Sequence, residues 1–540
     1  MTVETESAPA AAPSEPAPVN PYDAVPYSVC AFPQTRPDRL ATMAMLFGMQ
    51  PAPPDRCRVL ELGCASGGNL IPMALGAPES QFVGIDLSQR QIEEGQAITR
   101  ELGLANLELH TASILDVHRE WGLFDYILVH GVYSWVPPEV QDKILAICKE
   151  NLAPQGVAYI SYNAYPGWHA RGAVREMLWY HTRRMTDPVQ RIRAARGMMQ
   201  FLAASTVEDK SPVPAGGGYG LLLRQELALL KQVPDTYLLH EHLEEYNEPL
   251  YFHQFAQRAA DKGLQYLGEA QIGSMVASKF GPEIEKTLRQ ISPDLLHMEQ
   301  YMDFLRNRMF RQTLLCHEGV KLDYALKPEV VKDLYIASVA KPVSPEPDLS
   351  SDKPEQFRGP GQATLTTRDP LMKAAMVCLA ESWPMPMRFK ELLAAAKSRL
   401  EGATAGVEIG AASVEGLPTR ILNCFTSGLM EFSMSPPRIT TKISEKPVAS
   451  PYARLRARTD EKLVNYRLEP LLMRDPSRLI LRHLDGEHDM AALVAILVQW
   501  LKAQPLPTNG QPNLDGLEER AERYLQVLLK AFARGALLSA

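Results

Sequence analysis

The sequence predicts an α/β fold centred on a doubly wound parallel sheet with a helical insertion. Short apolar runs alternate with helical patterns through the first third of the chain, as in parallel sheets covered by helices. A turn rich in small residues, 63–68, joins the first apolar run to a helix, and the second run ends in an acid, Asp86. Because open α/β sheets bind ligands at the carboxyl ends of their strands, we expect the functional site at this edge.

The predicted elements follow one another in a regular order. The first strand is expected at 59–62, after a helix at 40–48, and further strands at 81–86, 107–110, 124–129 and 157–161. A capping box, Ser88-x-x-Gln91, opens the helix after the second strand, and prolines open the helix that runs to 151. Helical patterns at 170–199 and 221–233 predict an insertion over about 170–245. A helix at 251–260 and a closing strand at 262–268 then resume the sheet.

Composition shifts predict the domain boundaries. Residues 1–19 are rich in Ala, Pro, Glu and Ser, which predicts a disordered tail. The sheet domain is expected over 20–270 and a helical middle region over 271–340. Pro, Ser and Asp mark a linker at 341–363. The remainder, 364–540, is expected to be an α-rich accessory domain of small helical or winged-helix-like modules.

Overall composition excludes several classes of protein. With 46% hydrophobic and 22% charged residues, the 540-residue chain is typical of globular proteins, and its formal net charge of −7 disfavours a nucleic-acid substrate. No apolar run is long enough to span a membrane. The seven cysteines form no CxxC pair, so we expect no metal site, no disulfide scaffold and a cytoplasmic location.

The glycine turn and its neighbours indicate the cofactor. Gly63, Ala65 and Gly67 would let the backbone approach a ligand closely. Asp86 follows Gly63 by 23 residues, near the ~20-residue spacing at which an acid meets ribose hydroxyls. These features fit a dinucleotide or S-adenosylmethionine. The proper third glycine of G-x-G-x-x-G is missing, and Glu61 could neutralise a cationic amino-acid end, so S-adenosylmethionine is favoured.

Several longer motifs resemble one known family. They are Glu61-Leu-Gly-Cys-Ala-Ser-Gly-Gly-Asn69, Val83-Gly-Ile-Asp-Leu-Ser88, His130-Gly-Val-Tyr-Ser-Trp-Val-Pro137, Ser161-Tyr-Asn-Ala-Tyr-Pro-Gly-Trp-His169, Tyr246-Asn-Glu-Pro249 and Tyr301-Met-Asp-Phe-Leu-Arg-Asn307. Together they resemble class I S-adenosylmethionine-dependent methyltransferases with a methyltransferase regulatory domain, among them the rickettsial protein lysine methyltransferases that modify an outer-membrane protein. The resemblance covers about 20–330 and is only general beyond, at Arg474-Asp-Pro-Ser-Arg478 and Leu484-Asp-Gly486.

The resemblance implies a set of cofactor residues. The turn would hold the methionine part near Glu61, Asp86 would take the ribose, and Ser113 would border the adenine in place of the more usual acid. Tyr27 is a further candidate, for a flap over the cofactor. The full predicted set is Tyr27, Glu61, Gly63, Ala65, Gly67, Asn69, Asp86, Leu87, Ser113, Ile114, His130 and Gly131.

Polar and aromatic residues after the fourth and fifth strands are the candidates for acceptor chemistry. They are Tyr133, Trp135, Asn163, Tyr165 and His169. Aromatic faces suit an amine acceptor, whereas an oxygen acceptor would require a base such as His169 or His130. A protein lysine is the favoured acceptor. A small molecule or biosynthetic peptide and a non-catalytic cofactor-binding regulator stay open, as does homo-oligomerisation.

Overall fold

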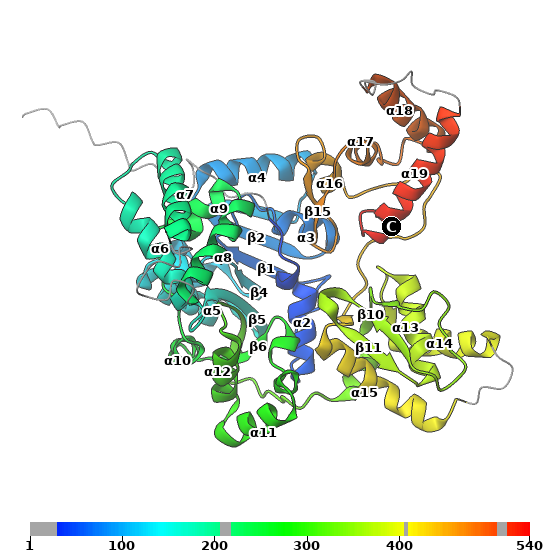
Figure 1. The fold of residues 1–540 in the computed structure, drawn as a ribbon, viewed down its shortest axis with the longest axis horizontal. Coiled ribbons are helices and arrows are strands. Elements are labelled where there is room, and N and C mark those ends of the chain that lie inside the picture. Colours follow the sequence, from blue (N-terminus) through cyan, green and yellow to red (C-terminus); the bar gives the residue numbers. More distant parts are fainter. Residues whose placement is uncertain (1–29, 206–217, 404–408, 505–515, 540) are drawn as a thin grey trace, which may run out of the picture.

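The computed structural model describes residues 30–205, 218–403, 409–504 and 516–539 (Figure 1). Its centre is a seven-stranded sheet with the order β3-β2-β1-β4-β5-β7-β6. The strands are β1 Arg58–Leu62, β2 Gln81–Asp86, β3 Leu107–Thr111, β4 Phe124–Val129, β5 Leu152–Asn163, β6 Leu264–Glu269 and β7 Phe310–His317. The first five run parallel and β7 is antiparallel to both neighbours. The strand order reverses between β1 and β4, which confirms the doubly wound prediction.

Helices cover both faces of the sheet because alternate strand residues point to opposite sides. Val59 packs in a core with α2 Pro37–Leu46, α3 Leu70–Gly76 and α4 Gln89–Glu101. Leu60 packs in a second core with α5 Pro138–Glu150 and α10 Phe252–Asp261.

The predicted helical insertion lies between β5 and α10. It consists of α6 Trp168–Thr182, α7 Pro188–Ser205, α8 Gly218–Gln232 and α9 Asp235–His242. Apolar side chains of all four helices, such as Val174, Met199 and Leu223, form a separate core. The insertion starts at the carboxyl edge of the sheet, five residues after β5 ends.

The expectation that 271–340 is helical is wrong in part. Helices α11 Pro282–Ile291 and α12 Leu295–Arg306 are present, but β7 follows them and enters the sheet between β5 and β6. Its pairing with β5 joins residues about 150 positions apart, such as Ile160 and Thr313, and local pattern carries no signal for such a contact. The sheet domain therefore extends well past residue 270.

The predicted linker is also corrected. Its residues form β9 Lys341–Pro342 and β10 Glu355–Arg358, which pair with β11 Thr364–Thr367 in a small antiparallel sheet. Phe357 is fully buried there. The buried ammonium of Lys373 donates to the carbonyls of Asp348 and Ser351 at 2.9 Å each, which anchors this Pro- and Ser-rich stretch.

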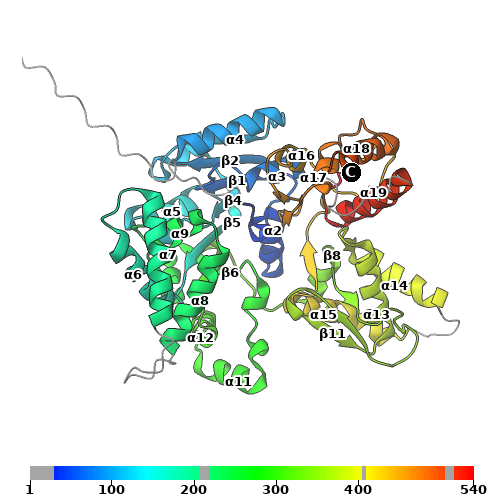
Figure 2. The same ribbon diagram turned by 45° about the horizontal axis from the view of Figure 1, so that its top comes forward.

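The expected accessory region at 364–540 contains two bodies, visible as yellow-green to yellow and as orange-to-red ribbons in Figure 2. The first, which we call the middle domain, contains α13 Pro370–Ser382, α14 Phe389–Ala403, α15 Ala411–Ser427 and the sheet of β8 Tyr335–Ala337, β12 Met387–Arg388 and β13 Glu431–Ser433. The second contains α16 Pro451–Arg456, β14 Lys462–Val464, β15 Pro470–Leu472, α17 Ser477–Arg482, α18 Met490–Ala503 and α19 Leu517–Arg534. The middle domain shares a core with α2, and Tyr452, Val464 and Leu468 of the second body also belong to that core. Most of the second body packs around a separate core of its own.

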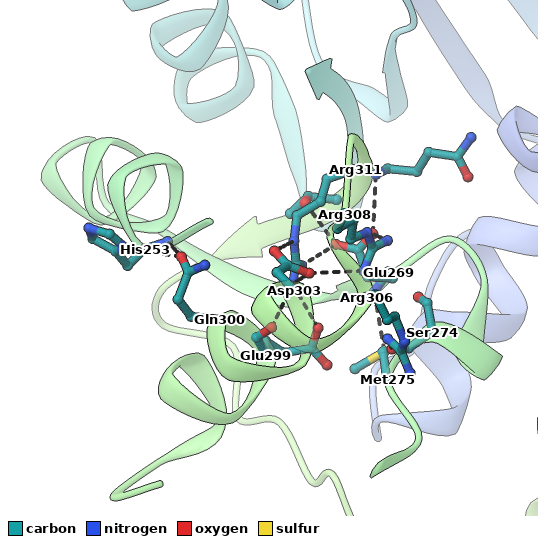
Figure 3. A network of polar contacts seen from close by, with 12 residues as sticks. His253, Glu269, Ser274, Met275, Glu299, Gln300, Asp303, Arg306, Arg308 and Arg311 are labelled. Atoms are coloured by element: carbon teal, nitrogen blue, oxygen red, sulfur yellow. Dashed lines mark hydrogen bonds and ion pairs between the residues drawn. The ribbon is translucent and has the colours of Figure 1, made fainter. Parts of the chain in front are cut away.

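A buried ionic network fixes α12 against β6 and β7 (Figure 3). Arg311, with no solvent exposure, binds Glu269 at 2.7 Å, Asp303 at 2.7 Å and Glu299 at 3.0 Å. Arg308 also binds Glu269, at 2.7 Å. Burial raises the pKa of Glu299 to about 7, which the attraction of Arg311 opposes. The network joins helix and strands with charges that water cannot screen.

Candidate active site

The turn after β1 has a backbone that only small residues follow easily. Gly63 and Gly67 have φ of 75° and 73°, and Ala65 has φ of 50°. A Cβ on Gly63 would lie 2.5 Å from Val132 Cγ2, closer than packed atoms approach. These angles and this contact confirm the tight strand-to-helix turn that the sequence predicted.

Asp86, at the end of β2, holds this turn in place. Its Oδ2 accepts the N–H of Ala65 at 2.9 Å and its Oδ1 accepts the N–H of Ser88 at 2.9 Å. A carboxylate oxygen accepts more than one hydrogen bond, so these contacts are compatible with binding ribose hydroxyls as well. The structure thus adds a structural role to the one predicted for Asp86.

Glu61 is a buried carboxylate with one oxygen unpaired. It is 3% exposed, and its Oε1 accepts from Asn69 Nδ2 at 2.8 Å. Its Oε2 is buried and accepts no hydrogen bond from the described residues. Burial raises the pKa of Glu61 to about 7; the bond from Asn69 opposes this and the charge of Asp86 adds to it. An unpaired buried carboxylate oxygen fits a cationic group such as the ammonium of an amino acid.

Asn69 connects Glu61 to the segment before α2, a link that sequence reasoning missed. Its Oδ1 accepts the N–H of Phe32 at 3.0 Å, and its Nδ2 also donates to Thr35 Oγ1 at 3.0 Å. The Phe32 ring contacts the His130 ring at a tilt of 38°, with centroids 3.8 Å apart. This segment therefore closes one side of the site. The other predicted residue upstream, Tyr27, lies outside the described residues.

Apolar side chains stand exposed on the side where the adenine was expected. Leu87 is 61% exposed and Leu115 is 42% exposed, while Ile114 is half-buried. The Ser113 hydroxyl accepts the N–H of Leu115 at 3.2 Å and so caps the short helix η2 Ile114–Asp116. Leu115 lies in the stretch expected at the adenine edge but was not selected as a cofactor residue, because exposure of an apolar residue is not visible in the sequence.

His130 and Gly131 follow β4 at the same edge. His130 Nδ1 lies 2.8 Å from Tyr159 Oη, and burial lowers the pKa of His130 to about 4. Gly131, with φ of 69°, donates its N–H to Ser161 Oγ at 2.8 Å. The imidazole is therefore neutral at physiological pH and does not repel a cationic sulfonium.

Three of the predicted acceptor residues lie at the end of β5 and just after it. Asn163 donates from Nδ2 to Asn247 Oδ1 at 2.9 Å, and its own N–H donates to Ser134 Oγ. Tyr165 stacks on His169 with centroids 4.0 Å apart. His169 is exposed and its Nε2 lies 3.0 Å from Tyr251 Oη.

The other two predicted acceptor residues pack against further aromatic side chains. Tyr133 is fully buried, and its ring packs edge-on against Tyr162 and Phe255. Trp135 packs edge-on against Trp168 with centroids 6.2 Å apart. Tertiary contacts turn the Tyr133 ring into the core on the α5 and α10 face, and its role in acceptor chemistry stays a prediction.

Two residues join the acceptor group that sequence reasoning did not select. Tyr251 lies 5.2 Å from the Tyr165 ring, and Asn247 pairs with Asn163. Both come from 246–251, just before α10, more than 80 residues after β5. The Tyr246-Asn-Glu-Pro249 motif marked this stretch as unusual without giving its place in the fold.

Three family models match successive parts of the chain. They are a methyltransferase domain over 54–188, a predicted methyltransferase regulatory domain over 234–317, and the PKMT C-terminal winged helix domain over 445–537. An uncharacterized protein of Rickettsia prowazekii is 35% identical over 530 residues, which covers 96% of this chain and 94% of the relative. PKMT2 from Rickettsia typhi in complex with AdoHcy is 31% identical, with a TM-score of 0.84, over 95% of this chain and 100% of that one.

The chain belongs to this family of S-adenosylmethionine-dependent methyltransferases. Its cofactor is S-adenosylmethionine, as the site around Glu61 and the glycine turn had indicated. The regulatory-domain match includes both β6 and β7, so that region completes the methyltransferase sheet. The winged-helix match covers the second C-terminal body, which confirms the predicted winged-helix-like fold there.

Two further properties concern the described residues alone. Within 30–205, 218–403, 409–504 and 516–539, no helix is both long and apolar enough to cross a membrane. In the same part of the chain, no group of three or more His, Cys, Asp or Glu side chains is arranged to hold a metal ion.

Proposed function

We propose that this methyltransferase transfers the methyl group to lysine side chains of a protein. S-adenosylmethionine supplies the methyl on a sulfonium, for an in-line displacement by the acceptor. The observation that carries the proposal is the chemistry of the acceptor group, which consists of aromatic rings and amides: Asn163, Tyr165, His169, Asn247 and Tyr251. Aromatic faces stabilise an alkylammonium product by ~0.5–2 kcal/mol each.

We assign the cofactor contacts on the same basis. Glu61, oriented by Asn69, would pair with the cofactor ammonium, because Glu61 Oε2 is buried and unpaired. Asp86 would accept the ribose hydroxyls, and the exposed apolar surfaces of Leu87 and Leu115 would pack on the adenine. Because Gly63, Gly67 and Gly131 carry no side chain, the cofactor would approach the backbone closely at these positions.

The acceptor residues would orient a neutral amine rather than act as a strong base. Tyr165 and Tyr251 lie ring to ring, and the exposed His169 is hydrogen-bonded to Tyr251. His130 is held neutral by burial and hydrogen-bonded to Tyr159, so it is a weak candidate for the base an oxygen acceptor would need.

An exposed apolar groove near the acceptor group supports a polypeptide acceptor. The groove, about 400 Å³, runs between α11 and α12 and is lined by Ile284, Leu288, Ile291, Tyr301, Phe304 and Leu305 among others. Phe304, 47% exposed, packs edge-on against Tyr251 with centroids 6.0 Å apart. Apolar residues flanking a lysine could therefore lie in the groove while the amine reaches Tyr251 and Tyr165.

Labelling a cell lysate with isotopically marked S-adenosylmethionine, followed by mass spectrometry, tests the proposal. We expect marked methyl groups on lysines of one or a few proteins. A marked small molecule or biosynthetic peptide would establish the alternative substrate class. Cofactor binding without any marked product would favour a non-catalytic regulator.

The acceptor atom is tested separately on the substrate so identified. Tyr165→Phe and Asn163→Ala should each lower turnover about tenfold with little change in cofactor affinity, since each removes a hydrogen-bonding group. His169→Ala should lower turnover less than either of these changes. Tyr180→Phe, at an exposed tyrosine of α6, is the matched control. An inactive His169→Ala variant that still binds cofactor would overturn the amine assignment.

The seven cysteines, all within the described residues, are free thiols. This supports the expected cytoplasmic location, which we keep as a proposal.

A further inference from the structure

A second cavity lies away from the methyltransferase site, where the sheet domain meets the middle domain. Its volume is about 580 Å³, within the range of small-molecule sites. One wall comes from α2, the short helices η5 Ile272–Ser274 and η6 Ala277–Phe280, and the end of α12. The other comes from the end of α15 and from β13, which contact η5 and α2 respectively. Figures 1 and 2 show α2 facing the middle domain at this junction.

Cations outnumber anions in the cavity lining. The charged lining residues are Arg39, Lys279, Arg306 and Glu431, three cations and one anion, so their formal sum is +2. Glu431 already forms an ion pair with Arg39 at 3.2 Å and another, at 2.6 Å, with Arg467, which lies outside the lining. Among the described residues, no carboxylate lies within 4.0 Å of the charged atoms of Lys279 or Arg306.

Lys279 and Arg306 are held near each other although both are positive. The Lys279 ammonium lies over Gly273, where a Cβ would come within 2.5 Å of Nζ. Partial desolvation and the charge of Arg306 lower the pKa of Lys279. Arg306 donates to the carbonyl of Ser274 and not to the carboxylates that bind Arg311, as Figure 3 shows. The carboxylates that act on Arg306, those of Glu299 and Asp303, are themselves bound by Arg311. Lys279 and Arg306 therefore remain two like charges that attract an anion.

The rest of the lining is apolar and aromatic. The Arg306 guanidinium lies 4.6 Å from the centre of the Phe280 ring. Phe425 and Phe432 stack with centroids 4.2 Å apart and planes 8° apart. These surfaces suit a ligand with an apolar ring or chain, and Lys279 is exposed, so that a ligand can reach it.

We propose that this cavity binds a small organic anion, a carboxylate, sulfonate or phosphate attached to an apolar ring or chain. The anionic group pairs with Lys279 and Arg306, and the apolar part packs on Phe280, Phe425 and Phe432. Because the two walls belong to different domains, the bound anion stabilises their contact. The site is independent of the acceptor chemistry proposed above.

Calorimetric titration of the full chain with naphthalene-1-sulfonate tests the proposal. Its neutral analogue, naphthalene-1-sulfonamide, has the same ring without the charge. We expect saturable binding of the sulfonate, at least about tenfold tighter than that of the sulfonamide, since each charge-assisted hydrogen bond is worth about one such factor. The Lys279→Met variant should lose about tenfold in sulfonate affinity, whereas Lys286→Met, at an exposed lysine of α11 outside the cavity lining, should not.

Thermal melts of the full chain give a second measurement of sulfonate binding. The sulfonate should raise the melting temperature of the wild type, and this effect should shrink in Lys279→Met and in Arg306→Met. Equal binding of sulfonate and sulfonamide, or wild-type affinity in the folded Lys279→Met protein, would overturn the assignment. Absence of saturable binding to the wild type at millimolar sulfonate would do the same.

Discussion

The charge state of Glu61 gives the sharpest prediction about the cofactor site. In the free protein its carboxyl has a pKa raised to about 7, chiefly by burial. A cofactor ammonium beside Glu61 Oε2 favours the carboxylate and lowers this pKa. Binding of S-adenosylhomocysteine should therefore release a proton whenever the free protein carries one on Glu61.

The sign and size of the pH effect follow from this pKa change. If the pKa of Glu61 falls from about 7 to its ordinary value of 4.5 on binding, the change is worth about 3 kcal/mol at low pH. Affinity should then fall as the pH falls, by about eightfold between pH values of about 7.5 and about 6. The pH range of the experiment ends at about 7.5 because the α-amino group of the ligand itself titrates near ~7.7–8.0.

Calorimetry in two buffers of different ionisation enthalpy measures both the affinity for S-adenosylhomocysteine and the number of protons released on binding. We expect release of about 0.9 proton at a pH of about 6 and about 0.5 at a pH of about 7. The Glu61→Gln variant should bind more weakly above neutrality, with neither proton release nor pH dependence in this window. A pH-independent wild type, or the same dependence in Glu61→Gln, would refute the placement of the ammonium beside Glu61.

Three further changes test how the site is held. Asp86→Asn should weaken cofactor binding at least about tenfold and lower the melting temperature, because its two oxygens accept backbone N–H groups that one amide cannot satisfy; calorimetry showing wild-type affinity would contradict this. Gly63→Ala should destabilise the protein strongly, since its Cβ would lie 2.5 Å from Val132 Cγ2. Adding Val132→Ala should recover part of the loss in a thermal melt, leaving about 1 kcal/mol of backbone strain, and a double variant no better than Gly63→Ala would count against the clash. Arg311→Leu leaves three buried carboxylates without their main partner and should cost about 3–5 kcal/mol. Hydrogen exchange in α12 should rise in that variant, and unchanged protection there would show that the network does not hold the helix.

The sequence by itself determined the parallel half of the sheet and the cofactor edge. These features are local, because a strand, its turn and its helix are neighbours in the chain and their signals are periodicity and residue size. Gly63, Glu61 and Asp86 were identifiable for that reason. Their spacing is set by one β-α-β unit, so the fold leaves them little freedom to lie elsewhere.

Only the tertiary structure decided what depends on contacts between distant segments. β7 completes the sheet beside β5, about 150 residues earlier in the chain. Tyr133 follows the same strand as His130, yet its ring turns into the core because Tyr162 and Phe255 lie beside it. Tyr251, just before α10, lies beside Tyr165, more than 80 residues earlier in the chain.

The interdomain cavity shows the same limit most clearly. Arg39, Lys279 and Phe432 line one space, although almost 400 positions separate the first from the last. Nothing in the local pattern around each residue marks it, since a lone cation or phenylalanine is common on any helix or strand. Their chemistry arises only when packing of the middle domain against α2 and η5 brings them together. Arg39 then pairs with Glu431, whereas Lys279 and Arg306 have no carboxylate within 4.0 Å among the described residues.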